Sequence, residues 1–372
     1  MSTTGTTATT DPAWVPDFLG PAYQQLELWT WAVTMRAPSW PPLSGTWLPR
    51  RSTPRPEPAH PLRPLVERLA PKPGPPPSAT AAPHAVLYIH GWADYFFQTE
   101  MAEYLNSTDI AFYALDLRKY GRSLRPHPSE GFTTDLQVYD ADIDAALSAI
   151  RTDLRLRHGH TPAPKIRLMA HSLGGLIAPL WANRHPGRLA SLILNGPWLE
   201  LQGSRFIRQI ATHLVDPFVR SDPKRVFHFP EMTAYWQSVS VLAHGSWDLK
   251  EEWRPAASFP LRAGWIKAVL NGHATVSTGL AIDAPVLMLL SEKTIIQAEW
   301  SPEMMGVDAV IDVNEMARLG LKIGHRVMVN RYSGALHDVM LSAPAIGTGS
   351  TRIWPTGCAP TAPAADISTI PS

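Results

Sequence analysis

The stretch IRLMAHSLGGLIAPLWAN, residues 166–183, decides the fold. Its first five residues form an apolar run typical of a buried strand, and the part from Gly175 to Asn183 has the composition of a helix. Between them, Ser172 is flanked two positions away by Ala170 and Gly174, and only small side chains fit beside a serine on a sharp strand-to-helix turn. Such a turn exposes the hydroxyl above the end of the strand. Ser172 is therefore predicted to be a catalytic nucleophile.

Strands and helices alternate on both sides of this turn. The predicted strands are the apolar runs 84–89, 110–115, 166–170, 189–195, 284–291 and 326–330. The predicted helices are 98–105, a long amphipathic segment from 135 to 154, 175–183 and 311–319. Fully apolar strands joined by helices are typical of a parallel sheet covered on both faces. The predicted fold class is α/β, with a mostly parallel, doubly wound sheet.

Residues 197–279 interrupt this alternation with helical pieces, many aromatic residues and no clear strand. Their position and composition predict a helical cap inserted between sheet strands. The predicted domains are an N-terminal segment 1–53, with antiparallel strands at 26–33 and 46–50, a linker 54–83, a core 84–196 and 280–345, the cap 197–279, and a C-terminal tail 346–372.

The predicted linker is rich in proline, and 18 of the 37 prolines of the chain lie within the first 83 residues. Proline fixes φ and removes a backbone donor, so the segment 54–83 is expected to hold no helix and no central strand. We interpret it as a solvated, polyproline-like insertion.

Charge and cysteine content exclude several classes of protein. The 33 Lys and Arg residues nearly balance the 32 Asp and Glu residues, which gives no reason to expect a nucleic acid partner. The single cysteine, Cys358, excludes an internal disulfide framework and a cysteine-rich metal site. The first twelve residues lack the basic and apolar parts of a secretory signal, and no apolar run is long enough to span a bilayer. We expect a cytoplasmic protein whose oligomeric state the sequence leaves open.

A serine hydroxyl needs a base, and the base needs an orienting acid. In parallel α/β folds with a serine on such a strand-to-helix turn, the catalytic residues follow one another along the chain in the order serine, acid, histidine. His337 follows the strand 326–330 after a short loop of small residues, which would present its ring at the carboxyl edge of the sheet. The acid should follow the strand 284–291. Asp308 is favoured there, and Asp312 and Glu292 remain alternatives.

The oxyanion of an acyl-transfer reaction needs two backbone donors. The amide of Leu173, directly after the nucleophile, is one, and the amide of Trp92 in the loop His90-Gly91-Trp92 is the other. The expected substrate-binding residues are aromatic: Tyr95, Phe96, Phe97 and Trp198.

Three stretches around these residues resemble a known family. They are YIHGWADYFFQTEMAEYL (88–105), FYALDLRKYGRSLRP (112–126) and MAHSLGGLIAPLWANRHP (169–186). They are similar to the serine-hydrolase branch of the α/β-hydrolase fold that includes monoglyceride lipases, lysophospholipases and serine aminopeptidases. VDAVIDV (307–313) and SGALHDVMLS (333–342) resemble the acid and histidine loops of that branch.

The resemblance covers roughly residues 84–345 and implies Ser172 as nucleophile, Asp308 as acid and His337 as base. It also implies the Trp92 and Leu173 amides as the oxyanion hole. Two departures are visible: Ala170 replaces the usual glycine, and a longer excursion, 293–307, precedes Asp308.

The predicted activity is hydrolysis of a carboxylic ester, of esterase or monoacylglycerol-lipase type, on a small apolar ester or monoacyl lipid. No cofactor and no metal are expected. One alternative is an aminopeptidase, which would need an acidic residue in the cap to hold the substrate ammonium; the candidates are Glu231, Asp248, Glu251 and Glu252. The other is a non-catalytic hydrolase-like binding protein. Acyl transfer to another alcohol shares the same motifs.

Overall fold

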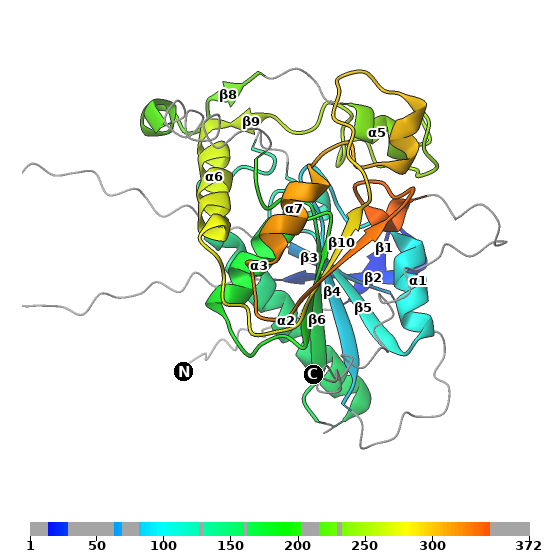
Figure 1. Ribbon diagram of the computed structural model, residues 1–372. Helices are drawn as coiled ribbons and strands as arrows, with labels where there is room; N and C mark the ends of the chain where they lie inside the picture. The colour runs from blue at the N-terminus through cyan, green and yellow to red at the C-terminus, as the bar shows by residue number, and fades with distance from the viewer. Residues whose placement is uncertain are drawn as a thin grey trace, which may run out of the picture.

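The computed structural model of the chain describes residues 14–28, 63–68, 82–125, 129–159, 162–201, 216–228 and 233–342, with 63–68 as backbone only. Its centre is a nine-stranded sheet in the order β1-β2-β3-β5-β4-β6-β7-β10-β11 (Figure 1). The strands are β1 (Val15–Asp17), β2 (Gly20–Leu28), β3 (Arg63–Arg68), β4 (His84–Ile89), β5 (Ile110–Leu115), β6 (Lys165–His171), β7 (Ser191–Asn195), β10 (Val286–Ser291) and β11 (Val327–Tyr332).

The strands from β5 to β11 in this order are all parallel, whereas β1, β2 and β3 join antiparallel at one edge. Alternate residues of each parallel strand enter different apolar clusters: Leu87 and Ile89 point to one face and Val86 and Tyr88 to the other. Because both faces are covered, the central strands β4 and β5 are mostly apolar, which is why the sequence revealed them. The predicted mostly parallel, doubly wound sheet is confirmed.

Helices cover both faces of the sheet (Figure 1). α1 contributes to the cluster on one face, and α2, α3 and α7 contribute to the cluster on the other. The α-helices are α1 (Thr99–Ser107), α2 (Asp140–His158), α3 (Gly174–Arg184), α5 (Ala234–Val239), α6 (Ala263–Ser277) and α7 (Val313–Gly320). The short 3₁₀ turns are η1 (Gly121–Ser123), η2 (Leu136–Tyr139), η3 (Pro302–Gly306) and η4 (Val339–Leu341).

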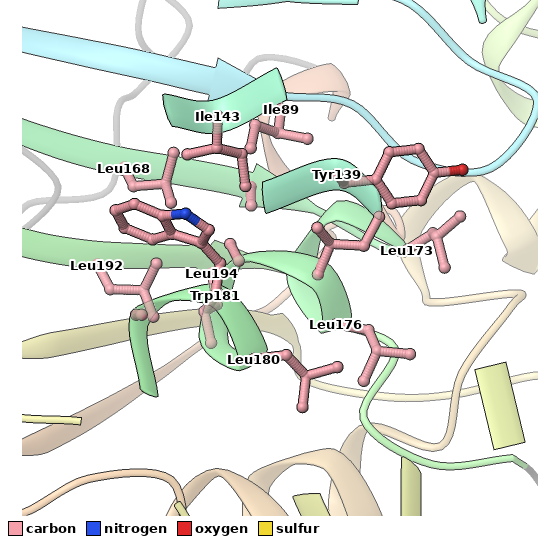
Figure 2. Close-up of a cluster of buried hydrophobic side chains, with 14 of the residues drawn as sticks. Ile89, Tyr139, Ile143, Leu168, Leu173, Leu176, Leu180, Trp181, Leu192 and Leu194 are labelled. Carbon is pink, nitrogen blue, oxygen red and sulfur yellow. The ribbon is translucent and has the colours of Figure 1, made fainter. Parts of the chain in front are cut away.

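Trp181 of α3 anchors this helix in the core. Its ring is fully buried and lies among Ile143 of α2, Leu168 of β6 and Leu192 of β7 (Figure 2). The indole N–H donates to Asp144 at 3.2 Å, so the one polar atom of the ring is satisfied. The packing fixes α3 on the sheet and thereby fixes the turn from which α3 begins.

The chain reverses its direction of winding between β4 and β6. β4 continues through α1 to β5 on one side of it, whereas β6 continues through α3 to β7 on the other side. In open α/β sheets, ligands bind outside the carboxyl ends of the strands at such a switch point. The loop after β4 and the turn after β6 meet there.

The described residues between β7 and β10 form an insertion of helices, turns and a two-stranded sheet, called the cap below. It contains β8 (Val226–Phe227), α5, β9 (Leu261–Arg262) and α6, which lie above the sheet in Figure 1. α6 packs closely on α3: a Cβ added at Gly272 would come within 3.3 Å of Leu176 and 3.2 Å of Leu180. The predicted helical insertion between sheet strands is confirmed. Within the described ranges, no helix combines the length and the apolar character needed to span a bilayer.

The prediction that segment 54–83 holds no central strand is wrong for Arg63–Arg68. These residues form β3, which is paired with β2 on one side and with β5 on the other. Pro64 pairs with Glu27 of β2 on one side only, because only residues 65–67 of β3 pair with β5. Proline is tolerated in a strand where one side has no partner strand. The high proline content of the segment 54–83 led to this error, because the six residues of β3 contain only one proline, Pro64.

Of the two strands predicted in the N-terminal segment, one overlaps β2 at residues 26–28. The remainder of that strand and the second, 46–50, lie outside the described residues. β2 begins earlier than predicted, at Gly20, where a hairpin joins it to β1.

Candidate active site

The turn between β6 and α3 holds Ser172 in an unusual backbone conformation. Its φ of 51° lies in the left-handed region, where few side chains are found. Gly174 is required two residues later, because a Cβ there would lie 2.5 Å from the carbonyl oxygen of His90. Ala170 is fully buried, so its single methyl group fits in the place of the glycine usual at this position. Ser172 is partly exposed.

Three side chains form a chain of hydrogen bonds at this turn. Ser172 Oγ lies 3.0 Å from His337 Nε2, and His337 Nδ1 lies 2.8 Å from Asp308 Oδ2. Asp308 is fully buried and His337 is 1% exposed, so the pair is shielded from water. The structure thus brings together the three residues that the sequence suggested, although 165 positions separate Ser172 from His337.

Asp308 is held in a fixed orientation. Its Oδ1 accepts hydrogen bonds from the amides of Val310 at 2.8 Å and Ile311 at 2.9 Å, which leaves Oδ2 directed at the histidine. The long excursion before it is a closed loop: the amide of Asp308 donates to the carbonyl of Lys293, and its carbonyl accepts from Ile295. The extra residues therefore do not displace the carboxylate.

The two alternative acids have other surroundings. Asp312 is the N-cap of α7, and its Oδ1 accepts from the amides of Asn314 and Glu315. The Glu292 side chain is exposed. Neither carboxylate is hydrogen-bonded to His337.

His90 orients the loop that carries Trp92. The amide of Leu117 donates to His90 Nε2 at 3.0 Å, which assigns the ring proton to Nδ1. Nδ1 then donates to the carbonyl of Gly91 at 2.8 Å. Because a trans peptide places its C=O and N–H in opposite directions, fixing the Gly91 carbonyl also fixes the direction of the Trp92 N–H.

This loop and the nucleophile turn are in contact. A Cβ added at Gly91 would lie 3.0 Å from Ser172 Cβ, so a larger residue there would crowd the nucleophile turn. Leu173 is the N-cap residue of α3, and its amide lies at the positive end of the helix dipole. The Trp92 and Leu173 amides therefore come from the two segments that border Ser172.

The aromatic residues predicted to bind substrate differ in their positions. Phe96 is fully buried and packs on Tyr88 and Phe112, so it belongs to the core, which corrects the expectation that it contacts substrate. Its loop has no periodicity from which the direction of each side chain could be predicted. Trp198 is half-buried beside the nucleophile, and its amide donates to the Ser172 carbonyl at 3.0 Å.

Tyr95 and Phe97 attach the same loop to the cap. The Tyr95 hydroxyl accepts from the amide of Lys250 at 2.7 Å, and burial raises the pKa of this tyrosine to about 12. The Phe97 ring meets Trp247 edge-on, with ring centroids 5.6 Å apart. Both side chains are almost fully buried in these contacts.

A buried polar cluster that was not predicted from the sequence supports the loop of His337. The carboxylate of Asp338 accepts from Asn195 Nδ2 at 2.6 Å and from Gln98 Nε2 at 3.0 Å. The amide of Val339 donates to Asn195 Oδ1 at 3.0 Å, so these bonds fix the loop that presents His337. The sequence did hold a signal for this cluster: Asn195 is the last residue of a parallel strand, and Asp338 directly follows His337.

His171 packs against the candidate base without replacing it. Its ring centroid lies 4.9 Å from that of His337, and its Nδ1 is 2.9 Å from the carbonyl of Asn195. Burial lowers the pKa of His171, and neighbouring His337 lowers it further, while Asp338 opposes the shift. The lowered pKa favours the neutral form of His171.

The arrangement suits nucleophilic attack by an alcohol on a carbonyl carbon. Ser172 is partly exposed, its neighbouring imidazole is hydrogen-bonded to a carboxylate, and the segments that carry the Trp92 and Leu173 amides lie beside it. The described part of the chain contains no group of three or more His, Cys, Asp or Glu side chains placed to hold a metal ion.

The chain is similar to known proteins in sequence and in fold. A family model described as serine aminopeptidase, S33, matches residues 80–299, more than half of the chain. A monoacylglycerol lipase of Mycolicibacterium smegmatis is 24% identical over 221 residues, which cover 56% of this chain and 69% of the lipase. The protein named 1-acylglycerol-3-phosphate O-acyltransferase ABHD5 of Rattus norvegicus is 35% identical over 92 residues, and the chain spans only 23% of its length.

A solved structure shows the same fold at low sequence identity. A soluble variant of the monoglyceride lipase of Saccharomyces cerevisiae superposes with a TM-score of 0.52 and 14% identity, covering 76% of this chain and 86% of that one. The chain therefore belongs to the serine aminopeptidase S33 family and has the α/β-hydrolase fold, on the branch that includes monoglyceride lipases and lysophospholipases.

Proposed function

We propose that the protein is a serine hydrolase that cleaves carboxylic esters with an apolar acyl chain. The observation that carries this proposal is the hydrogen-bonded chain from Asp308 through His337 to Ser172, at the carboxyl edge of the sheet. The nucleophile conformation, with a positive φ at Ser172, supports the same assignment.

In the proposed mechanism, His337 Nε2 takes the proton of Ser172 as Oγ attacks the ester carbonyl. The amides of Trp92 and Leu173 stabilise the tetrahedral oxyanion, and His337 then gives the proton to the leaving alcohol. Water, deprotonated by the same imidazole, cleaves the acyl-enzyme and regenerates Ser172. Asp308 keeps the Nδ1 proton of His337 directed at itself throughout.

The preference for an apolar acyl chain is supported by aromatic residues on the segments that border Ser172. Trp92 and Trp198 are both half-buried, and Trp265 of α6 lies close to both, with ring centroids at 3.8 Å and 6.1 Å. Such rings favour apolar groups. The names of two relatives, a monoacylglycerol lipase and a monoglyceride lipase, agree with this substrate class.

The family description keeps an aminopeptidase as the second candidate. Aminopeptidase activity would need a carboxylate facing the site to bind the substrate ammonium. Asp248, Glu251 and Glu252 of the cap are exposed at the surface, and Glu252 is paired with Lys250. Glu231 lies outside the described residues. The described cap thus favours the ester over the peptide.

The test compares wild type and Ser172→Ala on p-nitrophenyl esters of increasing acyl length and on aminoacyl anilides. We expect ester turnover that the substitution lowers on the order of 10⁴-fold or more. Faster turnover of anilides would support the peptidase. Absence of turnover in the wild type would support a non-catalytic binding protein. Faster release of p-nitrophenol when glycerol is added would support acyl transfer to an alcohol.

A further inference from the structure

A buried ion pair joins the cap to the loop that follows β4. Arg254 Nη1 lies 3.0 Å from Asp94 Oδ1, and the two side chains are 8% and 3% exposed. Burial disfavours the charge on Arg254, but Asp94 and Tyr235 more than offset this and raise its pKa above the ordinary value, so the guanidinium is charged. Desolvating such a pair is costly, and on stability grounds alone apolar residues would serve as well.

The ion pair continues to the candidate oxyanion hole. The second oxygen of Asp94 accepts from the amide of Gly91 at 3.4 Å, and Gly91 is the residue in contact with Ser172. Between these two lies Ala93, whose φ of 46° is strained for a residue with a side chain. The conformation that presents the Trp92 amide is therefore held in part by the Asp94 carboxylate.

Arg254 also reaches the loop that carries the candidate base. Its guanidinium carbon lies 5.5 Å from the centroid of the Tyr235 ring. The Tyr235 hydroxyl accepts from the amide of Asp338 at 3.2 Å, and its ring meets the His337 ring edge-on at 5.2 Å. One cap residue is thus linked to both loops that border the nucleophile.

Another buried arginine provides a comparison. Arg122 pairs with Asp17 and Asp116 and donates to the carbonyl of Phe96, so it joins β1, the loop after β5 and the far end of the loop after β4. None of its carboxylate partners bonds to Gly91 or contacts His337 in the described structure. The contacts of Arg122 attach structural elements to one another, whereas Arg254 is linked through Asp94 to the amide of Gly91 and through Tyr235 to the His337 loop.

We infer that Arg254 is a positioning residue: from the cap it holds the Trp92 amide through Asp94 and His337 through Tyr235. The inference rests on the proposed function. It means that the cap contributes to the rate of the chemical step as well as covering the site. Loss of Arg254 should lower kcat more than it raises KM, because the oxyanion donor acts mainly in the transition state.

Three variants test this. Arg254→Met removes the charge and keeps the length of the side chain, and Arg254→Lys keeps the charge. Asp94→Asn/Arg254→Met removes both charges, so that no unpaired carboxylate is buried, and protects the experiment against a single variant that does not fold. Each is measured for kcat and KM on a short p-nitrophenyl ester, for affinity toward a boronic acid that forms a tetrahedral adduct, and for melting temperature.

The matched control is Asp142→Asn. Asp142 lies on helix α2 and is fully buried, and the substitution removes its ion pair with Arg118, 2.7 Å away. It should lower the melting temperature and leave kcat unchanged. For Arg254→Met and the double variant we expect kcat about 10- to 100-fold lower, with boronate affinity falling in parallel and KM nearly constant. Arg254→Lys should restore part of kcat.

Folded Arg254 variants with wild-type kcat and boronate affinity would overturn the inference. A loss of kcat in Asp142→Asn as large as that in Arg254→Met would also overturn it, because the effect would then follow stability. Failure of all three variants to fold would assign Arg254 to stability alone and reject a positioning role. An inactive wild type would reject the proposed function instead, so the two failures are distinguishable.

Discussion

Asp308→Asn should abolish most of the activity while leaving the fold intact, because the hydrogen bonds of Asp308 determine which nitrogen of His337 carries the proton. Oδ1 accepts from the amides of Val310 and Ile311, so the carboxamide oxygen of asparagine must occupy that place. The NH₂ group then replaces Oδ2, 2.8 Å from His337 Nδ1. Since NH₂ can only donate, Nδ1 must accept, and the ring proton moves to Nε2.

A histidine protonated at Nε2 cannot take the proton of Ser172, whose oxygen lies 3.0 Å from that atom. A wrong tautomer of this kind costs on the order of 10⁴-fold in kcat, or about 5.4 kcal/mol of transition-state stabilisation. The assay is steady-state hydrolysis of a p-nitrophenyl ester, with circular dichroism and thermal unfolding as checks on the fold. The control is Asp312→Asn, which should leave kcat within about twofold because asparagine caps a helix as well as aspartate. A folded Asp308→Asn variant within tenfold of wild type, or a collapse in Asp312→Asn, would refute the assignment.

Three further predictions follow from the same structure. Gly174→Ala would place a Cβ 2.5 Å from the His90 carbonyl oxygen, so the nucleophile turn must shift and kcat should fall about 10²-fold; an unchanged kcat would mean that the turn adapts at no cost. Deletion of residues 63–68 removes β3 from between β2 and β5, and should abolish cooperative unfolding measured in urea; a normal transition would show that the sheet closes without it. Burial lowers the pKa of His171 in the folded protein. Between that lowered pKa and about pH 6.5, the unfolded state therefore binds more protons than the folded state. The free energy of unfolding should fall as the pH drops through this range, by up to about 1.4 kcal/mol per pH unit from this residue. Urea titrations of wild type and His171→Gln check this: the variant should show the smaller pH dependence, and equal slopes would contradict the prediction.

The parallel strands and the nucleophile turn could be predicted because their patterns are local. β4 and β5 have the bounds that their apolar runs suggested, since both faces of each strand are buried and no polar residue interrupts them. Ser172 was recognisable because small residues must flank it, and His337 because a short loop follows a strand.

β3 and the contacts of the cap depend on residues far apart in the chain. β3 forms because β2 and β5 both need a partner, a requirement that proline content does not reveal. The pair of Asp94 and Arg254 joins positions 160 residues apart, and nothing near either residue indicates the other. The directions of Tyr95, Phe96 and Phe97 were unpredictable because a loop has no period.

The most direct test of the account is to identify the residue that a fluorophosphonate modifies. The reagent is attacked by an activated serine, so intact-protein mass spectrometry and peptide mapping report the nucleophile without any choice of substrate. We expect one adduct, located on Ser172, lost in Ser172→Ala and formed much more slowly in Asp308→Asn. An adduct on another residue, or equal labelling of Ser172→Ala, would contradict it.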